Sequence, residues 1–254
     1  NTAYVILLLT TLFWGGNTVA GKLAVDHVSP FALTTLRWAL AFALVLPFAW
    51  KPLRRDWPRI RPALPLLVIL GTVGFTLFNA ALYTALTYTS AVNVSIEQAA
   101  VPMVIILLNF VVFRVRATWL QLVGFVLSLI GVVLTASHGD LSRLTALDLN
   151  AGDLLMMFAV VLYGGYTVAL RFKPDIHWLS MITILSAAAF VSSLPFLAWE
   201  HGSDSLIVPD RRGWLVILYT AIFPSVLAQV FYIRGNELIG ANRAGLFVNL
   251  VPIF

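Results

Sequence analysis

The chain has 254 residues, of which 60% are hydrophobic and only 11% are charged, and its net charge is +5. Soluble domains carry about 25% charged residues, so this composition excludes a water-soluble fold and predicts a membrane protein. The absence of cysteine from the sequence excludes disulfides, thiol catalysis and cysteine-ligated metals. No basic helix or aromatic–basic motif accompanies the positive charge, so we expect no binding to nucleic acid.

A membrane-spanning helix needs about 20 mostly apolar residues, and the sequence holds eight complete stretches of this kind. Their apolar runs are continuous, which predicts helices and not the alternating strands of a membrane barrel. We expect the first stretch to remain in the membrane, because no cleavage site and soluble domain follow it. The stretches cover residues 3–24, 31–50, 64–86, 90–113, 118–136, 151–170, 178–199 and 213–233, and a ninth begins near Gly240 and is still apolar at Phe254.

Lysine and arginine are unevenly distributed among the connections. The connections after the second, fourth, sixth and eighth stretches carry eleven of these residues, and the other connections carry four. Basic loops of membrane proteins face the cytoplasm. We therefore expect a multi-pass protein of a bacterial-type inner membrane, with a cytoplasmic N-terminus. The basic run from Lys51 to Arg61 also suits contact with anionic lipids.

The sequence contains an internal repeat. Trp14–Ala20 reads WGGNTVA and Tyr163–Ala169 reads YGGYTVA, so five of seven positions are identical at an offset of 149. Two independent anchors at nearly the same offset indicate one duplicated unit. The second set of matches has an offset of 150 and pairs Asn79 with Gln229, Ala91 with Ala241 and Pro102 with Pro252.

The first unit, residues 1–138, holds five stretches, an odd number, so the second unit, residues 150–254, is expected to enter the membrane inverted. Inverted repeats are typical of secondary transporters, whose substrate sites lie near the midplane. Phe254 aligns with Val104, whereas the first unit continues to about Thr135. We therefore expect an all-α membrane fold of ten helices in a 5+5 inverted repeat, with nine helices visible here and the last one incomplete.

Several short motifs recur in the order and spacing of a known family. They are Trp14–Asn17, Pro30, Arg37, Tyr83–Leu86, Thr89–Ala91, Pro102, Gly124, Gly131–Val132, Gly240–Ala241 and Pro252. With them the chain resembles the drug/metabolite transporter superfamily in its EamA-type branch, and within it the YddG-like bacterial amino-acid exporters. The chain departs from the family at Phe113–Arg116, where a Gly-Glu pair is frequent. The resemblance implies a ten-helix exporter or exchanger whose cavity is lined by helices one, three, four, six, eight and nine.

Polar and aromatic residues recur at helical spacing on these same stretches. Polar groups that face hydrocarbon lose their hydrogen bonds, so such residues face protein or water. Each of them either contacts substrate or bonds one helix to another. The predicted substrate-binding set is Trp14, Asn17, Asn79, Tyr83, Asn93, Glu97, Gln98, Tyr163, Tyr166, Gln229, Tyr232 and Asn249.

Glu97 is the only acidic residue deep inside an apolar stretch. A charge at the bilayer centre costs about 2.5–3.5 kcal/mol on insertion scales, so an intramembrane carboxyl group indicates a function. Three interpretations stay open from the sequence. Glu97 is a proton or amine site in the cavity, or the structural ion-pair partner of Arg37, which lies at a similar depth, or it is exposed to lipid or to a vestibule.

These features predict a secondary transporter that exports small organic metabolites by alternating access through a central cavity. Aromatic walls suit amino acids with aromatic or other large side chains, and amphipathic drugs. The alternatives are uptake or exchange of another metabolite, or a channel. We expect no enzyme, cofactor or metal site, because the histidines lie in or beside the connections and no paired carboxylates or phosphate-binding loop appear. The expected partners are a small-molecule substrate and membrane lipids, and a homodimer stays open.

Overall fold

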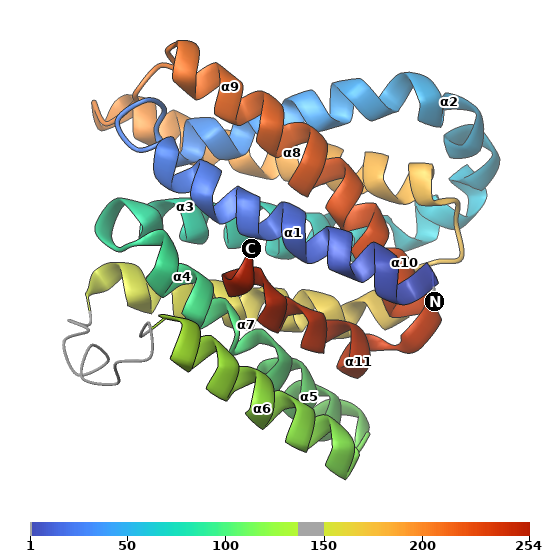
Figure 1. Ribbon diagram of the computed structural model, residues 1–254. Helices are drawn as coiled ribbons and strands as arrows, with labels where there is room; N and C mark the ends of the chain where they lie inside the picture. The colour runs from blue at the N-terminus through green and yellow to red at the C-terminus, as the bar shows by residue number, and fades with distance from the viewer. Residues whose placement is uncertain (1, 137–149) are drawn as a thin grey trace.

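A computed structural model of the chain describes residues 2–136 and 150–254. Residue 138, the predicted end of the first unit, lies outside this part. Within the described part the fold is a bundle of helices (Figure 1). Six of its helical segments are long and apolar enough to cross a membrane: Thr2–Leu23, Pro30–Tyr88, Ala91–Phe113, Ala151–Phe172, Trp178–Gly202 and Arg211–Ile239.

The segment Pro30–Tyr88 contains two crossings. Its 59 residues would measure about 88 Å as a straight helix, and the bilayer core is only about 30 Å thick. The segment comprises α2 (Pro30–Gly71), the π-helical η1 (Thr72–Leu77) and α3 (Phe78–Tyr88). Prolines bend helices, and α2 turns back on itself in Figure 1 over five interior prolines. The expected connection at 51–63 is therefore helical, which corrects the prediction of a loop there.

The fourth crossing of the first half contains a break. α1 (Thr2–Leu23) is continuous, whereas the fourth crossing divides into α4 (Ala91–Gln98) and α5 (Val101–Phe113). Pro102 lies in the first turn of α5, where its missing N–H is tolerated but where it cannot continue a helix from α4. α6 (Trp119–Ala136) follows and matches the fifth predicted stretch closely.

The second half has a similar succession of elements. It holds α7 (Ala151–Ala169), η3 (Leu170–Phe172), α8 (Trp178–Gly202), α9 (Arg211–Thr220), η4 (Ala221–Leu227), α10 (Ala228–Ile239), α11 (Ala241–Leu246) and η5 (Phe247–Ile253). Like η1, η4 is π-helical, a rare conformation that occurs most often at functional sites. The two π-helical segments begin at residues 72 and 221, the same offset that separates the two Gly-Gly motifs.

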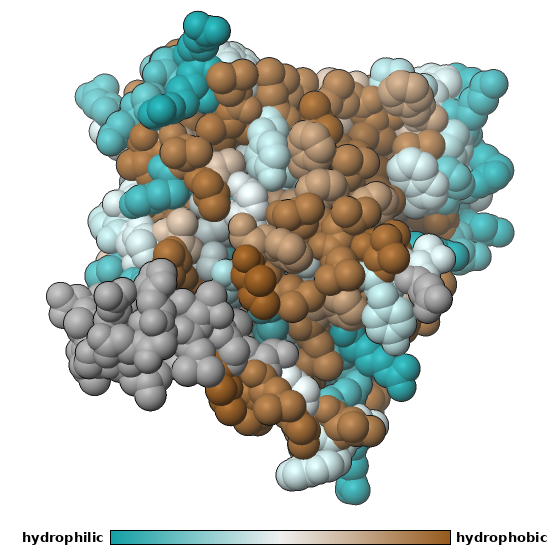
Figure 2. Space-filling model, in the orientation of Figure 1, coloured by the Kyte–Doolittle hydropathy of each residue, from teal (hydrophilic) through white to brown (hydrophobic). Residues whose placement is uncertain are grey.

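The bundle has two distinct ends. One end, called the basic end here, carries residues 51–61, and Arg59 Nη1 there donates to the Asp175 carbonyl at 3.1 Å. The opposite end carries the turn after α1 and the loop before α9, where the Asp210 N–H donates to the His27 carbonyl. In Figure 2 hydrophilic residues gather at the two lateral edges, and hydrophobic residues fill the band between them. This surface is typical of a multi-pass protein surrounded by lipid.

α2 and α8 pack along each other and are tied together at both ends. At the opposite end, the buried Glu200 carboxylate accepts hydrogen bonds from the Ser29 hydroxyl at 2.6 Å and the Ala32 N–H at 2.9 Å. At the basic end, the buried Asp56 accepts from the His177 N–H at 2.7 Å and the Ser180 hydroxyl at 2.8 Å. Each helix therefore has its N-terminus capped by a carboxylate of the other, which also complements the helix dipole.

Candidate functional site

An aromatic cluster lies where α1, α7 and α10 meet. The ring centroid of Trp14 is 5.4 Å from that of Tyr163 and 4.9 Å from that of Tyr232, and the two tyrosine rings are 5.7 Å apart. Phe78 and Tyr166 extend the cluster, at 4.8 Å and 5.3 Å from Tyr163. The structure thus brings four predicted site residues from both halves of the chain together in one cluster, with Phe78 as an addition that the sequence reasoning missed.

A small cavity lies beside this cluster. Its volume is about 20 Å³, whereas one water molecule needs about 10–15 Å³. The cavity is therefore too small for an organic solute, and the site is closed in this conformation. It is lined by Trp14, Asn17, Phe78, Gln98, Val101, Tyr163 and Val248.

Arg37 of α2 forms the centre of a buried polar network next to this cavity. Its side chain is 2% exposed. Its guanidinium lies 5.1 Å from the Trp38 ring centroid and 5.5 Å from that of Tyr83. The group donates from Nε to Ser225 Oγ at 2.8 Å, and from Nη1 to Asn17 Oδ1 at 3.1 Å, Asn79 Oδ1 at 2.8 Å and the Tyr83 hydroxyl.

All of these partners are neutral, and no ion pair joins Arg37 to an acidic residue of the described chain. The proposed pairing of Arg37 with Glu97 is therefore wrong. That pairing rested on equal depth, which does not specify the direction in which each side chain points around its helix. α4 packs mainly against α7, and Glu97 faces Asp153 of that helix. Asp153 was missed because its place in an Asn-x-x-Asp capping box is typical of a helix start.

The other predicted residues lie at different places around the cluster. Gln98 Nε2 donates to Thr18 Oγ1 at 3.1 Å, which bonds α4 to α1. Asn93 lies nearer the start of α4 and donates to Thr89 Oγ1 at 3.0 Å. Neither Asn93 nor Glu97 lines the small cavity. Gln229 and Asn249 are buried.

Several buried polar atoms around the cluster have no hydrogen-bond partner within the described chain. A polar atom that is buried without a partner costs about 1–3 kcal/mol, so such atoms are candidates for contact with a polar solute. They are the hydroxyl oxygens of Tyr163 and Tyr166, Oε1 of Gln229, and Oδ1 and Nδ2 of Asn249.

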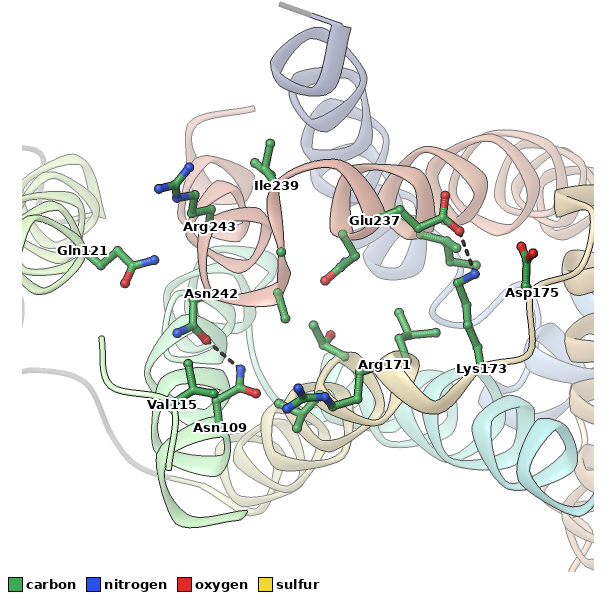
Figure 3. Close-up of a pocket in the computed structure, with 17 residues that line it drawn as sticks. Asn109, Val115, Gln121, Arg171, Lys173, Asp175, Glu237, Ile239, Asn242 and Arg243 are labelled. Carbon is green, nitrogen blue, oxygen red and sulfur yellow. Dashed lines mark hydrogen bonds and ion pairs between the residues drawn. The ribbon is translucent and has the colours of Figure 1, made fainter. Parts of the chain in front are cut away.

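A larger cavity of about 490 Å³ opens at the basic end between α5, α6, α10 and α11, and we call it the vestibule (Figure 3). Its wall includes an Asn109–Asn242 hydrogen bond of 2.6 Å and a Lys173–Glu237 ion pair of 2.7 Å. It reaches Thr167, whose hydroxyl lies 3.2 Å from the Tyr232 hydroxyl. The vestibule therefore leads toward the aromatic cluster from the basic end.

The opposite end is closed by polar contacts. Lys22 Nζ at the end of α1 donates to the carbonyls of Leu86 at 2.8 Å and Thr89 at 2.9 Å. His27 Nδ1 lies 2.7 Å from Asp210 Oδ2. Hydrogen bonds from the Gly213 N–H and from His27 hold the pKa of Asp210 below its ordinary value. In the described part of the chain, the vestibule therefore approaches the cluster from the basic end, whereas these contacts bridge the opposite end.

Comparison with known proteins identifies the family. The sequence profile of the EamA-like transporter family matches residues 1–137 and 150–254. The chain is 28% identical to "Uncharacterized transporter YyaM" of Bacillus subtilis over 98% of this chain and 82% of that protein. It is 26% identical to a "Probable terminal-alkyne amino-acid exporter" of Streptantibioticus cattleyicolor, over 97% of this chain and 80% of that protein.

A solved crystal structure has the same fold. It superposes with a TM-score of 0.74 at 20% identity, and the match covers 99% of this chain and 84% of the other. The family and these relatives are transporters, as the sequence predicted, and not enzymes. The chain belongs to the EamA-like transporter family.

Proposed function

We propose that the protein exports amino acids with aromatic or other large side chains, and amphipathic drugs, by alternating access through the closed central cavity. The observation that carries the proposal is the buried Arg37 network beside the aromatic cluster. A fixed cation that has no carboxylate partner among the described residues, together with a set of aromatic rings, is complementary to the two parts of such an amino acid. The name of the Streptantibioticus relative supports amino acids as the general substrate class.

Asn17 connects the two parts of the site. Its side chain lines the cavity and accepts a hydrogen bond from Arg37 at 3.1 Å. A substrate carboxylate that displaced this amide would form a charge-assisted, bidentate contact with the guanidinium, the geometry that arginine favours. The substrate side chain would then pack among Trp14, Tyr163 and Tyr232, and its ammonium group could lie over a ring face.

The proposed mechanism is a ten-helix transporter of two inverted five-helix units. Two observations support it: the Gly-Gly motifs and the π-helical segments recur at one offset, and the broken fourth crossing has its counterpart at α11 and η5. Inverted units that exchange conformations produce inward-open and outward-open states. With the basic end in the cytoplasm, the vestibule is the route by which cytoplasmic substrate approaches, which favours export.

Counterflow in proteoliposomes tests the function. We expect saturable counterflow of L-phenylalanine and L-tryptophan, weaker counterflow of glycine, and strongly reduced counterflow of L-phenylalaninamide, which keeps the ring and ammonium but lacks the carboxylate. Loss of a hydrogen bond to a charged group costs about 1.5–3 kcal/mol, or roughly 10- to 150-fold in affinity. Equal transport of the amide would overturn recognition by Arg37. An ohmic current in place of saturable flux would show a channel.

A further inference from the structure

The two halves of the chain bring two carboxyl groups together inside the bundle. Glu97 of α4 and Asp153 of α7 lie near each other where the two helices pack. Asp153 is 5% exposed, and Glu97 is partly buried. The buried atoms Asp153 Oδ1 and Glu97 Oε2 have no hydrogen-bond donor in the described chain. The sequence does not predict this pair, because the two residues are 56 positions apart.

Asp153 is held in place by its own helix. Its Oδ2 accepts the Asn150 N–H at 2.8 Å, while the Asn150 side chain accepts the Gly152 and Asp153 N–H groups. This capping box uses one carboxylate oxygen and leaves Oδ1 without a donor. The orientation of Asp153 is therefore fixed by the start of α7.

No cation of the described chain pairs with either carboxyl group. Among the elements packed against α4, α1 contributes Lys22, whose ammonium donates to two backbone carbonyls. α3 contributes Tyr83, which belongs to the Arg37 network, and Tyr88, which lies beside Gly152. α6 and η5 contribute no titratable residue. Against α7, α5 and η1 contribute none, and Arg171 of η3 and Arg243 of α11 line the vestibule at the basic end.

Two ionised carboxylates in contact repel each other strongly. At 4 Å the repulsion amounts to about 4 kcal/mol even with an effective dielectric constant of 20. A carboxyl pair avoids this cost when one member carries a proton and donates it to the other, as in other paired carboxyl sites. A proton is therefore the ligand that satisfies both orphan oxygens at once.

We propose that Glu97 and Asp153 form a proton-binding site that couples transport to the proton gradient. On the external side an O–H bond of a hydronium ion breaks and leaves a water molecule, one O–H bond forms on a carboxylate oxygen, and the α4–α7 contact closes over it. In the inward-open state that O–H bond breaks, and the proton passes to water on the cytoplasmic side. The ionised pair then repels, which favours opening of the opposite end. This inference rests on the proposed alternating-access function.

The test separates coupling from transport in proteoliposomes that contain the full chain. One coupled proton sustains about a tenfold substrate gradient per pH unit. For the wild-type protein we expect accumulation of L-phenylalanine driven by a pH gradient, together with counterflow at equal pH. For Glu97→Gln, which resembles the protonated form, we expect counterflow whose rate no longer depends on pH, and no gradient-driven accumulation. Asp153→Asn, which can still accept the Asn150 N–H, should behave in the same way.

The control is Asp26→Asn, which removes an acidic charge near the opposite end without touching the pair. Asp26 is exposed and has φ of 67°, a conformation that asparagine tolerates. We expect it to retain coupling. Infrared difference spectra at varied pH supply a second readout, since the wild type should lose a protonated-carboxyl band that Glu97→Gln lacks throughout.

Coupling that survives in Glu97→Gln, or wild-type counterflow without any response to a pH gradient, would overturn the proton site. Absence of wild-type counterflow for every amino acid tested would instead contradict the proposed function. Misfolding of Glu97→Gln would be detected as loss of counterflow. In that case the coupling of Asp153→Asn and the infrared band of the wild type decide whether the proton site exists.

Discussion

The α2–α8 pair and the central site differ in the hydrogen bonding of their buried polar groups. In the pair, Glu200 and Asp56 each satisfy the start of the other helix. In the central site, Arg37 has only neutral partners, and polar atoms of Tyr163 and Asn249 have none in the described chain. Carboxylates that are bonded at both ends of the pair resist separation of the two helices, whereas a site with unsatisfied groups favours exchange of partners. We infer that α2 and α8 form a scaffold around which the site rearranges.

The largest effect on stability is expected from Glu200→Ala. The substitution leaves the Ser29 hydroxyl and two N–H groups of α2 without an acceptor, at a cost of about 3 kcal/mol. Thermal unfolding in detergent measures this as a lowered Tm. Glu200→Gln keeps one acceptor oxygen and should be affected less. An unchanged Tm for Glu200→Ala would contradict the scaffold.

Arg37→Met should impair transport without lowering stability. Replacing a buried charge by an apolar side chain of similar size is often neutral or stabilising, so we expect an unchanged or higher Tm. Counterflow should fall about 10-fold or more, since the substrate carboxylate loses its charged donor. Arg37→Lys keeps the charge but not the bidentate geometry, and should retain part of the transport. A variant that unfolds instead would show that the Arg37 network is needed to hold the fold together.

Cysteine labelling compares the access of a reagent to the vestibule with its access to the closed central cavity. The chain has no cysteine, so each introduced thiol is unique. Arg243→Cys lines the vestibule and should react readily with an impermeant maleimide from the cytoplasmic side. Gln98→Cys lies beside the closed cavity and should react about tenfold slower or more, because minor open states populate roughly 0.1–10%. Labelling of Arg243→Cys from outside the cell would invert the proposed orientation.

The smallest effect is expected at the opposite end. Asp210→Asn keeps the helix cap, because asparagine caps as well as aspartate, but removes the charge that faces His27. Folding lowers the pKa of Asp210, so the contribution of this charge is present above the ordinary pKa of about 3.9 and is lost as the pH falls through the lowered value. We expect a slightly lower Tm at pH 7 and no difference from the wild type at strongly acidic pH.

The sequence by itself determined the features that depend on local pattern. Long apolar runs predict helices, because every backbone group in lipid must be bonded within its own segment. The resemblance motifs identified the family, and helical spacing selected Trp14, Tyr163 and Tyr232, which the structure gathers in one cluster. A recurring Gly-Gly motif marked the same offset that separates the π-helical segments.

Only the tertiary structure decided which faces of distant helices meet. Equal depth in the membrane suggested Arg37 as the ion-pair partner of Glu97. The angular position of each side chain around its helix instead directs Arg37 to Asn17 and Asn79, and Glu97 to Asp153. Likewise, the basic interruption between two apolar stretches predicted a loop at 51–63, but α2 continues through it, and Asp56 there bonds to the start of α8. Periodicity specifies the face of one helix, whereas a contact requires two faces and their packing, which no single stretch of sequence contains.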